Sequence, residues 1–153
     1  MTTGMKIGDL ARATQCPVET VRYYEREGLL SPPTRSSGNY RLYSPPHVDR
    51  LRFIRNCRAL DMTLDEIRIL LTLRDAPERG CDEVNALLEE HIGHVARRIV
   101  ELRALERELR EIRGQCRVVR SVRDCGILQS LGRDSGRPAT TRDSHGQLDR
   151  SHR

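Results

Sequence analysis

The sequence is poor in aromatic residues, with no tryptophan, one phenylalanine and four tyrosines. Large aromatic side chains supply much of the area that a core buries. A chain of 153 residues with so few of them is not expected to build a large core of its own. The composition favours one compact module with an appendage, and a partner chain that covers what this module leaves exposed.

Long apolar runs are also missing. No segment approaches the roughly 20 apolar residues of a membrane span, and residues 1–5 show no signal-peptide pattern. We therefore expect a cytoplasmic protein with no membrane partner. No pairing of a nucleophile with a base and no cofactor loop is visible, so we expect no enzymatic activity. Five cysteines in such a chain favour metal binding or redox chemistry over structural disulfides.

The net charge of +5 is unevenly distributed. Residues 1–60 carry 10 Lys/Arg and 5 Asp/Glu, whereas residues 61–113 carry 9 and 13. A basic N-terminal module suits a phosphate backbone as partner. Because Lys6 is the only lysine, an alternative is that arginine is abundant for reasons of genome base composition. Residues 132–153 have almost no apolar content and are expected to be a disordered tail.

Two short helices are predicted at residues 6–13 and 17–27, joined by a three-residue turn and ended by Gly28. This spacing is typical of a helix-turn-helix, whose second helix enters DNA. Arginine reads base edges or binds phosphate, and tyrosine donates to phosphate. The alternative is a solvated helix face with two core tyrosines. The candidate DNA contacts on the second helix are Thr20, Arg22, Tyr23, Tyr24 and Arg26.

A small hairpin is predicted next, because two short extended pieces flank the turn residues 37–39. A hairpin after a helix-turn-helix makes a winged helix. Its candidate contacts to the sugar-phosphate backbone are Arg35, Tyr40, Arg41 and Tyr43.

Three further helices are predicted at residues 45–60, 64–74 and 82–113. Thr63 and Glu66 form a capping box for the middle one. The last helix repeats apolar residues in a 3-4-3-4 rhythm over about four heptads, which is a coiled-coil pattern. Nothing comparable in the chain can cover that stripe, so we expect a homodimer. The stripe positions are Leu88, His91, Val95, Arg98, Leu102, Leu105, Leu109 and Ile112, and the polar His91 and Arg98 interrupt the apolar pattern.

Three cysteines lie at the two ends of the long helix. Cys81 precedes it, and Cys116 and Cys125 follow it with eight residues between them. A helix of this length separates them by roughly 50 Å, so a shared ligand requires two chains that run antiparallel. Each site would then combine Cys81 of one protomer with Cys116 and Cys125 of the other. A disulfide between Cys116 and Cys125, or inert surface thiols, are the alternatives.

The other two cysteines, Cys16 and Cys57, fall in the turn and in the third helix. There they are expected to act as small apolar residues.

Several closely spaced motifs resemble those of the MerR family of transcriptional regulators, over about residues 5–131. They are Ile7–Ala11, Thr20–Glu25, Gly28–Leu30, Asn39–Tyr43 and Leu64–Ile67. Within the family, the chain is similar to the lead- and cadmium-responsive branch (the PbrR and CadR types). This closer likeness lies in Phe53–Arg58, Leu60–Arg68, Val84–Leu88, Glu90–Ile92 and Cys125–Gln129.

The resemblance implies a mainly α fold: a winged helix-turn-helix, a long antiparallel coiled-coil dimerisation helix and a C-terminal metal-binding loop. We expect a DNA-binding domain at 1–75, the dimerisation helix and loop at 76–131, and the tail at 132–153. The resemblance also implies that the homodimer binds promoter DNA and distorts it when metal binds, so that RNA polymerase can use the promoter.

The identity of the ion is less well determined than the ligands. Three soft thiolates suit Pb(II), Cd(II) and Hg(II), and the resemblance favours Pb(II) or Cd(II). Copper(I) sensors of the family carry serine where this chain has Cys81. Zinc sensors add loop ligands that are absent here, so Zn(II) is a weaker alternative. His145 and His152 are too sparse to predict a second site. A thiol redox regulator on the same scaffold is a further alternative.

Overall fold

The structure is a computed structural model that describes residues 4–133 and residue 136. It contains two compact units, Met1–Leu87 and Leu88–Arg153, and each is described by itself. Most of the expected disordered tail, with His145 and His152, lies outside the described residues.

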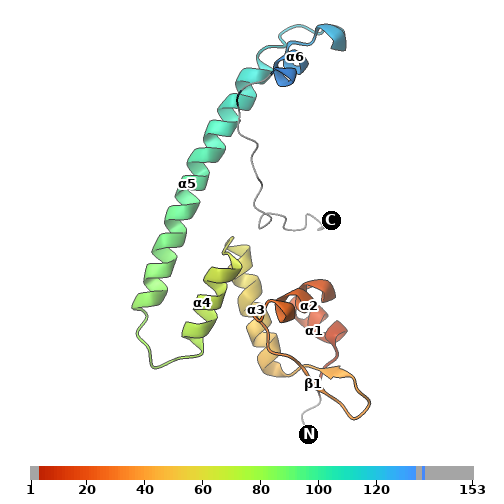
Figure 1. The fold of residues 1–153 in the computed structure, drawn as a ribbon, viewed down its shortest axis with the longest axis vertical. Coiled ribbons are helices and arrows are strands. Elements are labelled where there is room, and N and C mark those ends of the chain that lie inside the picture. Colours follow the sequence, from red (N-terminus) through yellow and green to blue (C-terminus); the bar gives the residue numbers. More distant parts are fainter. Residues whose placement is uncertain (1–3, 134–135, 137–153) are drawn as a thin grey trace. The chain divides into compact units, whose positions relative to one another are not determined.

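The first unit begins with the predicted helix-turn-helix, α1 (Ile7–Thr14) and α2 (Val18–Arg26) (Figure 1). The turn between them closes because Gln15 adopts a left-handed backbone with φ 53°, which lets the Cys16 N–H donate to the Ala11 carbonyl at 3.0 Å. Gly28 follows α2 with φ 73°, a conformation in which a Cβ would be strained. Glycine at this position therefore ends the second helix as predicted.

The predicted wing is a two-stranded antiparallel hairpin of β1 (Thr34–Arg35) and β2 (Arg41–Leu42). Its register pairs Thr34 with Leu42, and Arg35 with Arg41. Asn39 closes the connecting turn with φ 64°, a region that asparagine tolerates better than most residues. The winged helix expected from the sequence is thus confirmed.

Helices α3 (Pro45–Ala59) and α4 (Leu64–Arg74) complete the first unit. The capping box before α4 is present: the Thr63 N–H donates to Glu66 at 2.8 Å, and the Glu66 N–H donates to the Thr63 hydroxyl at 3.2 Å. Helices α1 to α4 share one apolar core with the loop that follows α2. Its fully buried members include Leu10, Val21, Leu29, Leu30, Leu51, Ile54, Ile67 and Leu71.

Arginines of α3 and α4 bind backbone carbonyls at or just beyond helix C-termini. Arg55 donates to the Thr14 carbonyl at 2.8 Å, and Arg68 donates to the Glu27 carbonyl at 3.0 Å. Arg58 likewise reaches the carbonyl of Met62 at 2.7 Å. Helix C-termini leave carbonyls without helical partners and carry partial negative charge. Part of the basic excess that favoured a phosphate partner therefore stabilises the fold instead.

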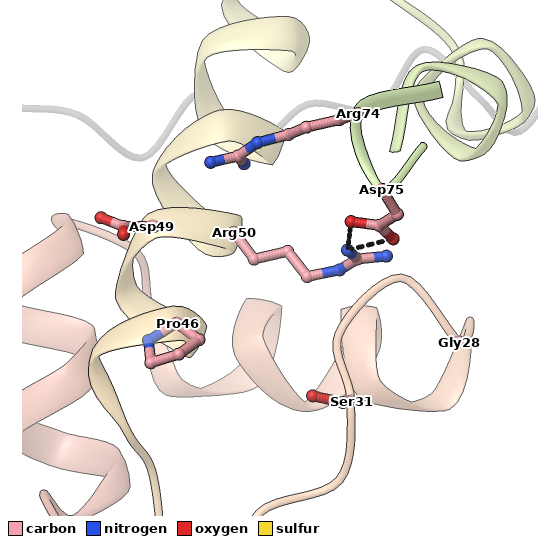
Figure 2. Close-up of a pocket in the computed structure, with 7 residues that line it drawn as sticks. All are labelled: Gly28, Ser31, Pro46, Asp49, Arg50, Arg74 and Asp75. Carbon is pink, nitrogen blue, oxygen red and sulfur yellow. Dashed lines mark hydrogen bonds and ion pairs between the residues drawn. The ribbon is translucent and has the colours of Figure 1, made fainter. Parts of the chain in front are cut away.

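Arg50 of α3 makes a similar contact beside a hollow of about 550 Å³ (Figure 2). Its Nε donates to the Leu29 carbonyl at 2.7 Å. One terminal nitrogen also contacts both carboxylate oxygens of Asp75, at 3.0 and 3.3 Å. Asp75 caps the C-terminus of α4, so Arg50 ties the end of α4 to the segment that follows α2.

Helix α5 (Asp82–Arg113) is continuous over 32 residues, which corresponds to about 48 Å. The long helix predicted from the heptad pattern is confirmed with the same bounds. A loop follows it, with a short 3-10 helix η1 (Val122–Asp124) and helix α6 (Gly126–Gly132). Within the described part of the chain, no helix is both long enough and apolar enough to cross a membrane.

Candidate DNA interface and metal site

Helix α2 presents basic and aromatic side chains to solvent. Arg22, Tyr23 and Arg26 are exposed, and Thr20 is half-buried. Arg22 also pairs with Glu19 one turn earlier, at 3.5 Å. These residues can contact phosphate or base edges, as the sequence predicted for this helix.

The wing adds a second basic surface. Arg35, Tyr40 and Arg41 are exposed, and the Arg35 guanidinium donates to the Asn39 side chain at 3.1 Å. The Lys6 ammonium lies 5.4 Å from the centre of the Tyr40 ring. The wing therefore exposes two arginines and an aromatic ring, and Lys6, just before α1, lies beside that ring.

Two residues that the sequence predicted as DNA contacts, Tyr24 and Tyr43, are instead buried in the structure. Tyr24 is 5% exposed and Tyr43 is 1% exposed, and both belong to the core of the first unit. Tyr24 follows Val21 by three positions, so the two share the inward face of α2. The alternative of core tyrosines was therefore right for Tyr24, while Tyr23 is 40% exposed.

Glu25, one of two acidic residues on α2, is a functional residue that the sequence did not reveal. The Tyr43 hydroxyl donates to one Glu25 oxygen, and the Arg41 guanidinium lies 3.7 Å from the other. Burial, together with the bond to Glu25, raises the pKa of Tyr43 to about 12. Tyr43 thus acts as a neutral donor, and Glu25 links α2 to β2. The available signal was its position directly between two predicted DNA contacts, Tyr24 and Arg26.

The structure brings Cys116 and Cys125 close together after α5. Cys116 is exposed and Cys125 is half-buried. The backbone N–H of Leu128 lowers the pKa of Cys125, with smaller contributions from the N–H of Ile127 and the Cys116 side chain. A lower pKa favours the thiolate, which is the form that ligates metals and acts as nucleophile.

A glycine allows this approach of the two thiols. A Cβ at Gly126 would lie 2.7 Å from the Gln115 carbonyl oxygen, closer than such atoms approach. Only glycine lets the chain after Cys125 pack against the residue before Cys116 without displacement. A hollow of about 390 Å³ beside them is lined by Cys116, Arg117, Val118, Arg120, Asp124 and Gly126, among others.

The third predicted ligand, Cys81, is exposed directly before α5. The Asn85 amide lies 3.9 Å from its sulfur. Cys16 and Cys57, by contrast, are buried, and burial raises the pKa of both thiols. These two behave as apolar core residues, as expected.

The fold and these surfaces define a DNA-binding regulatory protein with thiol groups outside its winged helix. Two family models match it: the MerR HTH family regulatory protein over residues 5–73, and the MerR DNA-binding region over residues 48–112. The chain belongs to the MerR family.

Its relatives include several metal-linked regulators. The chain is 52% identical to the HTH-type transcriptional regulator ZntR homolog of Haemophilus influenzae, over 71% of this chain and 81% of that one. It is 60% identical to the transcription regulator PbrR691 of Ralstonia metallidurans CH34, solved in complex with lead(II), with a TM-score of 0.72 and coverage of 83% and 98%. The regulator MerR of Bacillus megaterium MB1, solved with mercury(II), is 32% identical with a TM-score of 0.63, covering 84% and 100%.

Proposed function

We propose that this protein is a metal-responsive transcriptional regulator that binds promoter DNA as a homodimer. On binding Pb(II) or Cd(II), it activates genes of heavy-metal resistance. The observation that carries the proposal is the proximity of Cys116 and Cys125 just after α5, with a third exposed thiol, Cys81, just before it. These thiols are accessible in a chain whose other cysteines are buried.

The donor set fits a soft divalent ion. Thiolates select soft cations, and ligation removes their protons. We assign Cys116 and Cys125 of one protomer and Cys81 of its partner as the ligands. The relatives support this class of effector, since one was solved with lead(II) and another with mercury(II). We propose Pb(II) or Cd(II) as the effector, with Hg(II) and Zn(II) as alternatives.

The homodimer is supported by the exposed apolar stripe of α5. The predicted stripe residues Val95, Leu102, Leu105 and Leu109 are 39%, 48%, 50% and 57% exposed in the single chain. A contiguous apolar face of this kind marks a protein interface, and its heptad spacing suits a second helix. Antiparallel pairing would bring Cys81 of one protomer to the loop of the other.

The DNA contacts proposed are the exposed members of the predicted set. They are Thr20, Arg22, Tyr23 and Arg26 on α2, and Arg35, Tyr40 and Arg41 on the wing. Because the metal ligands would come from both protomers, occupancy would fix the relative position of the two DNA-binding units in the cytoplasmic dimer. Bending a promoter site of this size costs on the order of 1–6 kcal/mol. Such a bend could make the promoter usable by RNA polymerase.

The proposal is tested by titrating the reduced protein with Pb(II), Cd(II), Hg(II) and Zn(II). Thiolate charge-transfer absorbance and run-off transcription are measured on the same samples. We expect one ion per trithiolate site and the strongest activation with Pb(II) or Cd(II). Activation by Zn(II) alone would reassign the effector, and activation by none of the four would contradict the proposal.

Exposed arginines are tested separately on the promoter duplex. Arg22→Ala or Arg41→Ala should weaken binding by about 1–3 kcal/mol or reduce the salt slope by about one. An unchanged affinity and slope would argue against a DNA contact at that position.

A redox-responsive regulator is the second candidate, favoured by the proximity of the Cys116 and Cys125 thiols. A peroxide could oxidise them to a disulfide, with the two thiol protons and two electrons passing to the peroxide to form water. This candidate predicts that hydrogen peroxide activates transcription in the absence of metal. Loss of two free thiols without activation would instead leave the metal-responsive function in place.

A further inference from the structure

Glu25 places a mostly buried carboxylate beside the exposed arginines of α2 and the wing. It lies on α2, next to the exposed Arg26, and its side chain is 14% exposed. A carboxylate close to DNA repels the phosphates, so its place on the helix predicted to enter DNA calls for a compensating contribution.

The contacts of Glu25 supply that contribution. Its first oxygen accepts a hydrogen bond from the Tyr43 hydroxyl, and its second faces the Arg41 guanidinium at 3.7 Å. Tyr43 is a firm anchor, because it is 1% exposed and its ring packs edge-on against His47 with centroids 5.3 Å apart. The carboxylate is therefore fixed on its buried side and holds an exposed arginine on the other.

We propose that Glu25 is a positioning residue for DNA recognition, which holds the Arg41 guanidinium ready for contact and fixes the wing relative to α2. The inference rests on the proposed contact between Arg41 and DNA. A free arginine loses rotamer freedom when it binds, whereas an arginine that is already held loses less. The gain from this preorganisation would exceed the repulsion that Glu25 adds.

The pair of Arg22 and Glu19 on the same helix offers a matched comparison. Its partners are 3.5 Å apart within one turn of α2, and their side chains are 48% and 82% exposed. That pair joins no second element and has no buried anchor. Glu19→Gln and Glu25→Gln therefore remove the same charge from one helix, and only the second disturbs a link between α2 and the wing.

The experiment measures binding of the full chain to two duplexes by fluorescence anisotropy. One duplex carries the promoter site, defined first by footprinting of the unmutated protein, and the other has random sequence. For Glu25→Gln we expect roughly three- to tenfold weaker binding to the promoter site, with random-sequence binding unchanged or tighter. For Glu19→Gln we expect the ratio of the two affinities to stay as in the unmutated protein.

A double-mutant cycle with Arg41→Ala tests whether Glu25 acts through Arg41. We expect Glu25→Gln to have no further effect on the affinity ratio once Arg41 is removed. The same loss in both backgrounds, or equal shifts on both duplexes, would overturn the positioning role. An Arg41→Ala variant with full promoter affinity would overturn the proposed contact itself, and the positioning role with it.

A second variant covers the case in which Glu25→Gln disturbs folding. Tyr43→Phe removes the anchoring hydroxyl and keeps both charges. We expect it to lower the affinity ratio about two- to threefold at unchanged helical content, a smaller loss than a full charged hydrogen bond. An unchanged ratio in folded Tyr43→Phe protein would show that the anchor does not position Arg41.

Discussion

The first unit, Met1–Leu87, which contains the winged helix and is called the winged-helix unit below, buries most of its apolar side chains. Helix α5 leaves many of its apolar side chains exposed. In the first, Leu51, Ile54 and Ile67 are completely buried. On α5, Ile92 and Leu105 are 58% and 50% exposed. Across the described residues, no buried side-chain nitrogen or oxygen lacks a hydrogen-bond partner. The two regions therefore differ in apolar burial and not in polar satisfaction, and α5 presents apolar side chains that a second helix could cover.

The cysteines differ in the same way between core and surface. Burial raises the pKa of Cys16 and Cys57, which keeps these thiols protonated inside the winged-helix unit. Cys125 has a lowered pKa and lies near the exposed Cys116. One residue type is therefore a buried core side chain in one setting and an accessible thiol, our proposed metal ligand, in another.

The largest expected effect comes from a substitution that tests whether the exposed thiols, and not the buried ones, respond to metal. Cys81→Ser should abolish metal-dependent transcription and leave promoter binding intact, because it removes one of three proposed ligands outside the DNA surface. Run-off transcription and anisotropy on the same preparation measure both properties. Loss of DNA binding in a folded Cys81→Ser protein would contradict this separation of roles.

Cys57→Ala is the matched control for that substitution. The thiol is buried, so its loss should lower the free energy of unfolding by about 1 kcal/mol. The stoichiometry of bound metal should not change. A reduced stoichiometry would mean that a core thiol takes part in binding.

A second prediction concerns the apolar stripe of α5. Leu105→Glu should convert the proposed dimer to monomers, because it would bury a charge in the interface. Sedimentation velocity at micromolar concentration measures the change. Val100→Glu is the control, since Val100 is 65% exposed on the same helix but lies outside the heptad stripe. Equal dissociation by both variants would argue against the stripe as the interface.

Local signals explain why the sequence predicted the helices well. The capping box of Thr63 and Glu66 and the stop at Gly28 act within a few residues. The 3-4-3-4 rhythm likewise predicted the bounds of α5. The proximity of Cys116 and Cys125 was harder to predict from the sequence, because it depends on how closely Gly126 can approach Gln115.

Long-range contacts explain what the sequence did not predict. The bond between Arg68 and Glu27 spans 41 residues, and that between Tyr43 and Glu25 spans 18. Arginine and tyrosine serve both DNA contacts and helix ends, so composition could not separate the two uses. Tyr43 was therefore predicted as a DNA contact although it anchors Glu25.

A third prediction tests how far the winged-helix unit depends on its own core. Leu51 is fully buried in α3, so Leu51→Ala should lower the free energy of unfolding by about 2–5 kcal/mol. Chemical denaturation followed by circular dichroism measures the loss. Leu109→Ala, at a site 57% exposed in the single chain, should lose stability only to the extent that the dimer forms. Its effect should therefore grow with protein concentration, and that of Leu51→Ala should not.

The smallest expected effect lies at the pair of Arg50 and Asp75 (Figure 2). The Asp75 side chain is 59% exposed, so Asp75→Asn should cost at most about 1 kcal/mol of unfolding free energy. Arg50→Ala should cost more, because it also removes the donor to the Leu29 carbonyl. Thermal melts at low and high salt distinguish the two, since screening weakens only the ion pair. Equal losses in both variants would mean that the carbonyl contact adds nothing, and that the winged-helix unit depends less on its arginines than its hydrogen bonds suggest.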